Sequence, residues 1–381
     1  MHLLDAKEEI LCNIEAGNAS MLTSGSGMGK SSIMHQIFGE LAAAGQPGEW
    51  GMGVSFAATM NPIDTMGVPF KGTYKYQNYL GEEKELTVTD PSVPLWMIST
   101  EGKPASCYKH FFWFCDEYGQ GEADTKRGLS EIFLSGGNGM WRLPEGSVRV
   151  AASNTGQRYG VTKDFDFAIA RRTIIPIEGN VDITLNYLDK PYRWQGRDWQ
   201  TMPVVKAWAK AHSEILFEAE PKEQGPWCNP RTLCSFDRYL QAKAARFNGS
   251  VPIQDKTQAA RITAMGAGTI GMGATSSLMA HLQFKLELPQ YEDVVKDPAG
   301  TPVPKKADLL MLMAYELAGR TQVADLAAVL QYVQRLPQDM CVTFVQALLR
   351  RDYKNIINNP VMQAWVHKNA SLISIIEALA H

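Results

Sequence analysis

The chain has 381 residues, of which 45% are hydrophobic and 20% are charged, which is the composition of an ordinary globular protein rather than a disordered or fibrous one. Lysine and arginine number 37 against 40 aspartates and glutamates. The resulting net charge of −3 argues against a protein built to coat nucleic acid. The length is enough for two or three domains with a large buried core.

The cysteines and the apolar stretches bear on where the protein works. The six cysteines form no Cys-x-x-Cys pair, so zinc is not expected and a reducing, cytoplasmic setting fits best. Charges between Asp5 and Glu9 break any apolar run that could serve as a signal peptide. Residues 263–282 carry no charge, but their glycines and hydroxyl groups make them too polar for a membrane span. They predict a close-packed helix, or a broken pair of helices, inside a helical domain.

The first elements in chain order lead into a glycine-rich loop. A helix is expected over residues 3–16 and a strand over 20–23, and the loop 24–31 (SGSGMGKS) then opens a helix expected over 30–41. Glycines let backbone N–H groups curl around a phosphate, and the helix directs its positive dipole end at it. Ser24 stands where the usual pattern has its first glycine, and serine fits there if its φ stays negative.

The side chains of this loop have separate expected tasks. Lys30 would reach the β- and γ-phosphates, and the Ser31 hydroxyl would ligate Mg²⁺. The residues expected to hold the nucleotide are Gly25, Ser26, Gly27, Met28, Gly29, Lys30, Ser31 and Ser32.

The next stretch contains an aromatic hairpin. A second strand is expected over 51–60, and a helix begins near Asn61. Residues 69–90 then predict a β-hairpin insert, because apolar residues alternate on both sides of a Gly-Glu-Glu turn. The aromatic residues Tyr74, Tyr76 and Tyr79 form a binding face in one interpretation. In the other, which the sequence favours somewhat, the hairpin packs its own apolar side.

A continuous apolar run, Phe111–Cys115, ends in two carboxylates. Such a run is typical of a strand that is buried on both faces of a parallel sheet, and open α/β sheets bind ligands at the carboxyl ends of their strands. Asp116 is expected to hold Mg²⁺, and Glu117 to orient and polarise the attacking water. A later strand over 148–153 ends at Asn154, whose side chain could hold the same water or make a local turn.

The rest of the first half completes the sheet. A helix is expected over 124–133, a small hairpin around 136–144, a helix over 165–172 and a strand over 173–178. Arg171 and Arg172 lie at the last boundary, where either can present its charge to the γ-phosphate of a neighbouring subunit.

After Gly179 the sequence predicts helices only. They are expected over 181–189, 201–218 and 232–245, with Asn229 and Pro230 suited to cap and open the third and Arg231 directed out of its first turn. Residues 289–306 indicate a linker or extended arm because of their prolines. Further helices are expected over 307–317, 323–336, 340–350 and 372–379.

The order of these motifs resembles that of AAA+ ATPases, and within them the MoxR-like branch. Residues 24–31 are similar to Walker A, 111–117 to Walker B, Asn154 to sensor 1, Arg172 or Arg171 to the arginine finger, and 229–231 to sensor 2. The hairpin falls where this branch carries its helix-2 insert. The resemblance covers residues 1–250. It implies an α/β core over 1–180, with a parallel five-stranded sheet flanked by helices and hairpin inserts, an all-α lid over 181–282 and a helical extension over 283–381.

The resemblance also implies an activity. It implies ATP hydrolysis with Mg²⁺ in a ring expected to have six subunits, with catalytic roles for Glu117, Asn154, Arg171 or Arg172, and Arg231. MoxR-like members typically act with a partner that carries a von Willebrand factor A domain, and they remodel or activate a target protein.

Two other functions stay open. A DNA-directed motor or restriction-type NTPase subunit would use the aromatic hairpin with Lys71, Lys75 and Lys84. A nucleotide-gated scaffold would bind nucleotide and turn it over slowly because of Ser24.

Overall fold

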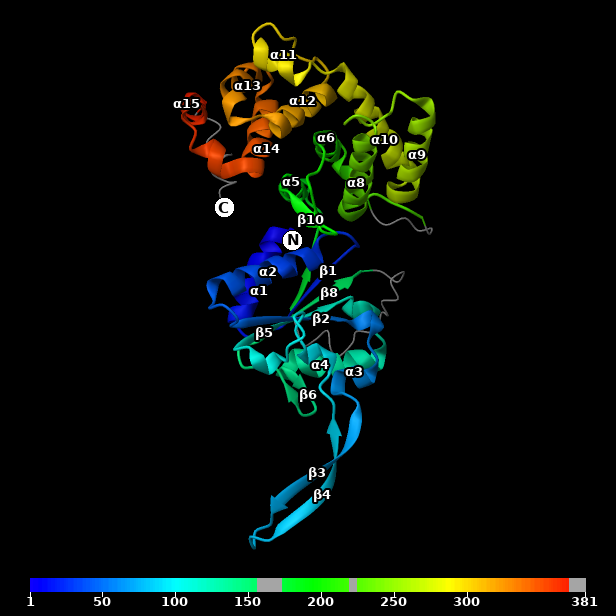
Figure 1. The fold of residues 1–381 in the computed structure, drawn as a ribbon, viewed down its shortest axis with the longest axis vertical. Coiled ribbons are helices and arrows are strands. Elements are labelled where there is room, and N and C mark those ends of the chain that lie inside the picture. The colour runs from blue at the N-terminus through cyan, green and yellow to red at the C-terminus, as the bar shows by residue number, and fades with distance from the viewer. Residues whose placement is uncertain (156–172, 219–224, 370–381) are drawn as a thin grey trace. The chain divides into compact units, whose positions relative to one another are not determined.

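The structure is a computed structural model that describes residues 1–155, 173–218 and 225–369. It divides into two compact units, Met1–Gly179 and Asn180–His381 (Figure 1). The helices expected over 165–172 and 372–379 lie outside the described residues. The boundary expected near residue 282 stays a prediction.

The first unit is built on a parallel sheet of five strands, as the sequence predicted. The order across the sheet is β2-β5-β8-β1-β9. The expected strand over 51–60 ends early at Phe56, because Phe56 pairs with Asp116, the last residue of the neighbouring strand, and the chain beyond it turns into a short 3-10 helix. The strands are β1 (Ser20–Ser24), β2 (Trp50–Phe56), β5 (His110–Asp116), β8 (Val148–Asn154) and β9 (Thr173–Pro176).

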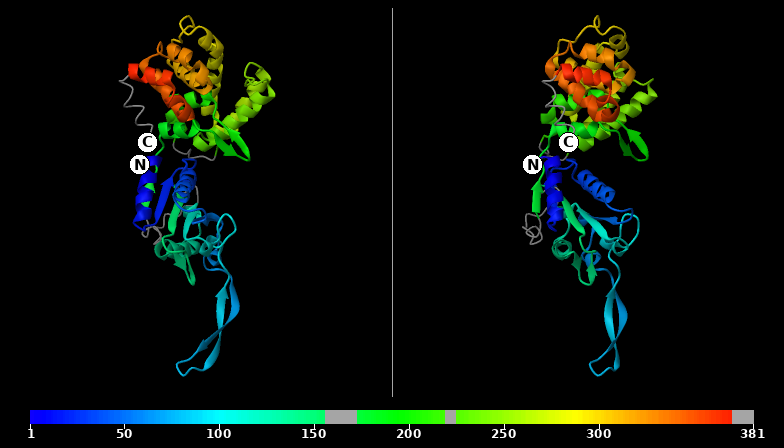
Figure 2. Two further views of the ribbon diagram at one scale, coloured as in Figure 1. Left: turned by 60° about the vertical axis from the view of Figure 1, so that its left-hand side comes forward. Right: turned by 90° about the vertical axis from the view of Figure 1, so that its left-hand side faces the viewer.

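Helices cover both faces of this sheet (Figure 2). The strand β5 alternates its apolar side chains between two cores, which confirms that it is buried on both sides. Phe112 and Phe114 pack with α1 (Leu3–Glu15) and α2 (Lys30–Ala44). Phe111, Trp113 and Cys115 lie in a second core with residues of α4 (Ala123–Ser135).

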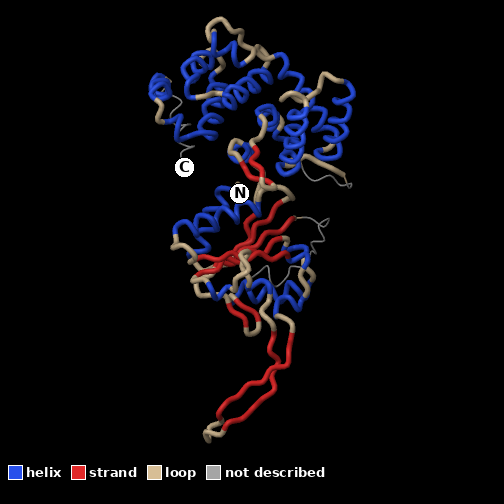
Figure 3. The backbone as a smooth tube through the Cα atoms, in the orientation of Figure 1, coloured by secondary structure: helices blue, strands red, loops and turns tan. Residues whose placement is uncertain are grey.

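Two hairpins extend from the first unit. The long one pairs β3 (Pro69–Gln77) with β4 (Glu83–Pro91) over its full length and projects away from the sheet (Figures 1 and 3). It follows the short helix α3 (Pro62–Met66), whose capping box at Asn61 confirms the predicted helix start. The small hairpin consists of β6 (Gly137–Asn138) and β7 (Trp141–Arg142), also as expected.

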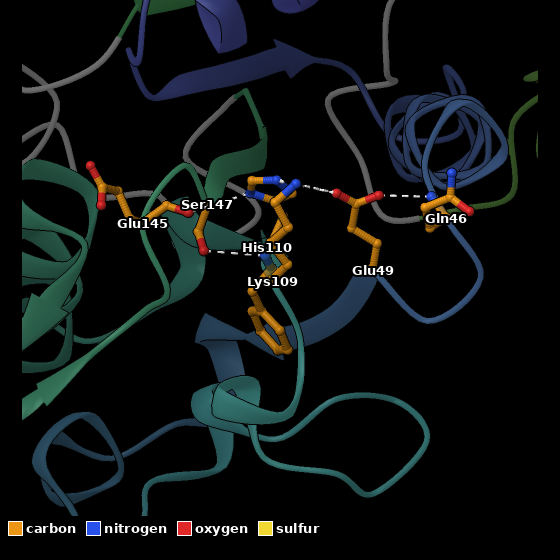
Figure 4. Close-up of polar contacts among 7 residues, drawn as sticks. Gln46, Glu49, Lys109, His110, Glu145 and Ser147 are labelled. Carbon is orange, nitrogen blue, oxygen red and sulfur yellow. Dashed lines mark hydrogen bonds and ion pairs between the residues drawn. The ribbon is translucent and has the colours of Figure 1, made fainter.

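A polar network lies at the amino ends of the strands (Figure 4). Glu49, just before β2, accepts hydrogen bonds from Lys109 Nζ at 2.6 Å and from the backbone N–H of Gln46 at 2.7 Å. His110 Nδ1 lies 3.3 Å from the carbonyl oxygen of Glu145, and the Ser147 hydroxyl accepts from the N–H of Phe111 at 3.2 Å. These contacts join the segments that precede three neighbouring strands.

The second unit is helical around one continuous core that involves residues from Leu185 to Trp365. The chain bends at Gly271 (φ 82°) between α9 and α10, so the uncharged stretch 263–282 is the predicted broken pair of helices. No helix among the described residues has the length and apolar character needed to span a membrane. The helices are α5 (Val181–Leu188), α6 (Pro203–Ala211), α7 (Ser213–Leu216), α8 (Pro230–Arg246), α9 (Lys256–Ile270), α10 (Met272–Phe284), α11 (Tyr291–Lys296), α12 (Ala307–Arg320), α13 (Leu326–Val333), α14 (Gln338–Ile357) and α15 (Pro360–Lys368).

Three predictions for this unit need correction, and one helix was missed. The expectation of helices only was wrong, since β10 (Tyr192–Trp194) and β11 (Arg197–Trp199) form a hairpin. Its two-residue turn, Gln195-Gly196, has positive φ at both residues, and glutamine gives little warning of such a turn. The helix expected over 201–218 breaks at His212, the supposed linker 289–306 contains α11, and α15 was not predicted.

Candidate nucleotide-binding site

The glycine-rich loop joins the strand β1, which lies between β8 and β9 in the sheet, to the helix α2. Gly27 and Gly29 have φ values of 79° and 87°, a backbone region that side chains strongly disfavour. Ser24 is the last residue of β1. Its φ is not positive, so serine fits at this position. Gly29 directly precedes the first turn of α2, whose N–H groups have no intrahelical partner. The loop therefore has the backbone that a phosphate cradle needs.

Lys30 is buried, with an exposed fraction of 7%, inside this loop. Its ammonium group donates hydrogen bonds to the Gly25 carbonyl at 2.8 Å, the Ser24 hydroxyl at 2.9 Å and Asn154 Oδ1 at 3.0 Å. Asn154 reaches Lys30 because β8 lies beside β1 in the sheet, with Ser24 and Asn154 in register. Two residues that are 124 positions apart in sequence thus meet at one point.

Ser31 and Asp116 form the second contact of the site. The Ser31 hydroxyl donates a hydrogen bond to Asp116 Oδ2 at 2.6 Å, and the other carboxylate oxygen accepts from the Glu117 N–H at 2.8 Å. A hydroxyl and a carboxylate are the hard oxygen ligands that Mg²⁺ prefers. The described residues contain no group of three or more histidine, cysteine or acidic side chains that could hold a metal. The pair therefore fits Mg²⁺ that takes its other ligands from phosphate and water.

Glu117 has a backbone conformation that the sequence did not reveal. Its φ of 52° and ψ of 32° are left-handed, which is uncommon for a residue other than glycine. The turn that follows is held by Ser153, whose hydroxyl accepts from the N–H of Gly119 at 3.2 Å. The sequence placed Ser153 at the end of a strand but gave it no role, because this contact depends on β5 and β8 lying side by side. Left-handed residues of this kind concentrate at functional sites.

The remaining predicted site residues lie in different parts of the chain. Gly25, Ser26 and Met28 lie in the loop, and Ser32 is an exposed residue of the first turn of α2. Arg171 and Arg172 lie outside the described residues. Arg231 belongs to the second unit, in the first turn of α8, where Asn229 Oδ1 accepts from the N–H of Thr232 at 3.0 Å. The predicted cap and proline at this helix start are confirmed.

The predicted site residues of the first unit lie at the carboxyl ends of three neighbouring strands. The phosphate loop follows β1, Asp116 ends β5 with Glu117 directly after it, and Asn154 ends β8, the middle strand of the sheet, between them. The first unit therefore has the α/β architecture expected for it, a parallel five-stranded sheet flanked by helices. A helical region follows it in the chain, which completes the fold class that the motifs implied.

Comparisons with known proteins find only distant likeness. No protein-family model and no curated protein matches the chain. Among solved structures, NtrX from Brucella abortus is 14% identical over 72% of this chain and 67% of its own, with a TM-score of 0.29. A point mutant of RuvB from Thermotoga maritima is 12% identical over 83% and 82%, with a TM-score of 0.33. AMPPCP-bound DnaA from Aquifex aeolicus is 12% identical over 96% and 93%, with a TM-score of 0.32. At these values the function has to be argued from the site itself.

Proposed function

We propose that this chain is a Mg²⁺-dependent ATPase of the AAA+ type. The observation that carries the proposal is the meeting of three strand ends at the phosphate loop. Lys30 contacts Asn154 at 3.0 Å, and Ser31 contacts Asp116 at 2.6 Å. A glycine-rich turn before a helix needs neither contact, whereas a nucleotide site needs a cation, a metal ligand and a polar group for water in one place.

The loop supplies the binding energy for the triphosphate. Backbone N–H groups between Gly25 and Lys30 and the positive end of α2 face the phosphate oxygens. Lys30 exchanges its carbonyl and amide partners for the β- and γ-phosphate oxygens. Because its ammonium group is buried, its attraction for those oxygens is screened less than that of a surface lysine.

Ser31 and Asp116 would hold the metal. Mg²⁺ bound there would neutralise negative charge on the β- and γ-phosphates. Glu117 orients the attacking water and draws its proton, while Asn154 fixes the water from the neighbouring strand. The hydrogen bond between Ser153 and the turn after Glu117 holds the ends of β5 and β8 in a fixed position relative to each other.

The assembly belongs to the same proposal. In a ring of subunits, six by the MoxR resemblance, Arg171 or Arg172 of one protomer stabilises charge on the γ-phosphate held by its neighbour, and Arg231 responds to the bound nucleotide. An arginine given in this way raises the rate of phosphoryl transfer by about a thousandfold or more. Turnover per subunit then depends on protein concentration.

The work done by the motor is remodelling of a protein partner, with a von Willebrand factor A domain protein as the expected associate. The charge of the long hairpin supports this over DNA. Residues 69–91 contain three lysines against four acidic side chains, which is a poor surface for a phosphate backbone. DNA that stimulates turnover in a salt-sensitive way would overturn this choice.

Nucleotide turnover is the direct test. Phosphate release from ATP and from GTP is measured over a range of protein concentrations, for the wild type and for Glu117→Gln. The wild type is expected to hydrolyse ATP and to turn over faster per subunit as concentration rises, and the parallel measurement with GTP shows which nucleotide it prefers. Glu117→Gln should bind ATP normally and release almost no phosphate.

Glu145→Gln is the matched control, because Glu145 lies in the turn before β8, at the opposite edge of the sheet. It should behave as the wild type. Tight binding of nucleotide by the wild type with no phosphate release would replace the motor by the nucleotide-gated scaffold.

A further inference from the structure

The long hairpin has one apolar face and one polar face. Strand alternation and the register of the two strands place Phe70, Tyr74 and Tyr76 of β3 on the same side as Leu86 and Val88 of β4. We call this side the apolar face. The rings of Tyr74 and Tyr76 stack at 6.4 Å, as expected for neighbours on one side. The opposite side carries only polar residues between the two terminal prolines: Lys71, Thr73, Lys75, Gln77, Glu83, Glu85, Thr87 and Thr89.

This apolar face lies in solvent. Exposed fractions are 60% for Phe70, 60% for Tyr74, 52% for Leu86 and 42% for Tyr76. The expectation that the hairpin packs its own apolar side is therefore wrong, since the hairpin projects away from the sheet that could have covered it (Figures 1 and 2). A two-stranded ribbon is marginally stable alone, and an exposed apolar patch of this kind marks an interaction site.

We propose that the apolar face packs against the same face of a second copy of this chain, with the two hairpins antiparallel. The charges at the two ends of the face are the first reason. Asp90 pairs with Phe70 near the base, and Lys84 pairs with Tyr76 near the tip. A two-fold axis between the hairpins, perpendicular to the strands, brings each Lys84 over Asp90 of the other copy. Such self-complementarity is the mark of an isologous contact.

The shapes along the face agree with the charges. The same axis places Tyr74 over Gly72, which has no side chain of its own, and Leu86 over Val88. It also places Tyr76 over Phe70, an aromatic pair. Stacking the hairpins in parallel would instead set Lys84 over Tyr76 and Asp90 over Phe70, which leaves all four charges without a partner. Only the antiparallel arrangement gives both Lys84 and Asp90 a partner of opposite charge.

Other occupants fit the face less well. Nucleic acid would need cations, but Lys71 and Lys75 lie on the opposite side, and Lys84 already makes an exposed ion pair with Glu82 at 2.9 Å. If the face bound a different protein, there would be no reason for the charge at one end of the face to be opposite to the charge at the other end. Lys84 can exchange Glu82 for Asp90 of the other copy at little cost, since exposed ion pairs contribute little to stability.

The expected strength of one contact is low. Nine residues of a two-stranded ribbon cover about 30 Å by 10 Å, or about 300 Å² on each copy. A stable interface buries about 800 Å² on each partner, so a single pair of hairpins associates weakly. Several hairpins presented by one oligomer would associate far more tightly, because the later contacts form within one complex.

Site-specific cross-linking tests the arrangement directly. Cysteines are placed at Lys84 and Asp90 in full-length protein whose exposed Cys12 and Cys107 are changed to serine. A short bis-maleimide is used because facing sheets lie about 10 Å apart, too far for a disulfide. Covalent dimers are expected for Lys84→Cys/Asp90→Cys. The matched control, Glu85→Cys/Thr89→Cys, has the same symmetry about the axis on the polar face and should stay monomeric on a denaturing gel. Equal yields from the two variants, or none from either, would overturn the proposal.

Charge reversal separates a second copy from any other occupant. Lys84→Asp and Asp90→Lys should each weaken self-association by about fivefold in sedimentation equilibrium. The double variant should recover most of the loss, because each reversed charge meets its reversed counterpart. Lys71→Glu, on the polar face, serves as the control and should change nothing. Loss without recovery in the double variant would show that the face binds something other than itself. The result does not depend on ATPase activity.

Discussion

The two edges of the central sheet gather similar side chains and differ in what those side chains can do. At the carboxyl edge Lys30, Asp116 and Asn154 meet at the ends of three strands. At the amino edge Glu49, Lys109 and His110 meet at the beginnings of two (Figure 4). The side chain of Lys109 is 69% exposed, whereas Lys30 as a residue is only 7% exposed.

The direction of the chain explains the difference. In a parallel sheet with crossover helices, helices begin near the carboxyl edge and end near the amino edge, so their positive dipole ends gather at the former. The first turn of α2, whose N–H groups have no partner within the helix, and the left-handed glycines of the loop lie at this same edge. An anion is therefore stabilised at one edge only, although both have a lysine. Four predictions test this comparison.

The largest effect is expected from removing the buried lysine. Lys30→Met should lower ATP turnover by at least about a hundredfold, because it deletes a preorganised positive charge from a buried site. Steady-state phosphate release measures it. Lys109→Met, the matched change at the amino edge, should leave turnover unchanged. If both variants lose activity equally, the difference between the edges is not electrostatic.

Changing the proposed metal ligand should have the next largest effect. Asp116→Asn keeps the hydrogen bond from Ser31 but removes the negative charge, so the Mg²⁺ concentration for half-maximal turnover should rise about tenfold or more. A Mg²⁺ titration of phosphate release checks this. Asp124→Asn, at an exposed position in the first turn of α4, is the control. An unchanged Mg²⁺ requirement would remove Asp116 from the metal site.

A smaller effect is expected at Ser24. Its hydroxyl accepts a hydrogen bond from Lys30 at 2.9 Å, which has to be exchanged when phosphate binds. Ser24→Gly restores the usual loop residue and removes this competitor, so ATP should bind a few-fold more tightly, since a net hydrogen bond is worth about 1 kcal/mol. Equilibrium binding of a fluorescent ATP analogue measures the change. Weaker binding would show that the hydroxyl supports the loop instead.

The smallest effect is expected at the amino edge. The hydrogen bond from Lys109, followed by that from the Gln46 N–H, lowers the pKa of Glu49 below its ordinary value of 4.5. A lowered pKa means that Glu49 stabilises the fold above pH 4.5, and that this contribution fades as pH falls through the lowered pKa. Glu49→Gln should therefore unfold at a slightly lower temperature than the wild type at pH 7, with the gap closing in acid. Its turnover should be normal. A gap that widened in acid would contradict the sign.

The contrast between loop and hairpin shows how far sequence reasoning reached. The loop, the acidic pair and the strand that ends at Asn154 follow from local patterns, because glycine, a buried apolar run and a strand-end polar residue each have a local meaning. The left-handed Glu117 and the Ser153 contact did not follow from any such pattern. Both depend on how β5 and β8 lie side by side, which no single stretch encodes.

The hairpin illustrates the opposite case. Its strands and turn were evident from alternation, and its register from Pro69–Pro91 to Gln77–Glu83 needs no distant part of the chain. Whether its apolar side is covered was predicted wrongly, because burial depends on where the ribbon points. The β10-β11 turn was also missed, because glutamine at position 195 rarely adopts the positive φ that this turn requires.

Local chemistry alone determined the phosphate loop, the buried strand before the two carboxylates and the hairpin with its two unlike faces. Each of these rests on spacing between residues that are near one another in the chain. Only the tertiary structure decided that Lys30 touches Asn154, that Ser31 touches Asp116 and that the aromatic face is left in solvent. The reason is that strand order sets which distant residues become neighbours, and strand order is chosen by the packing of the whole core.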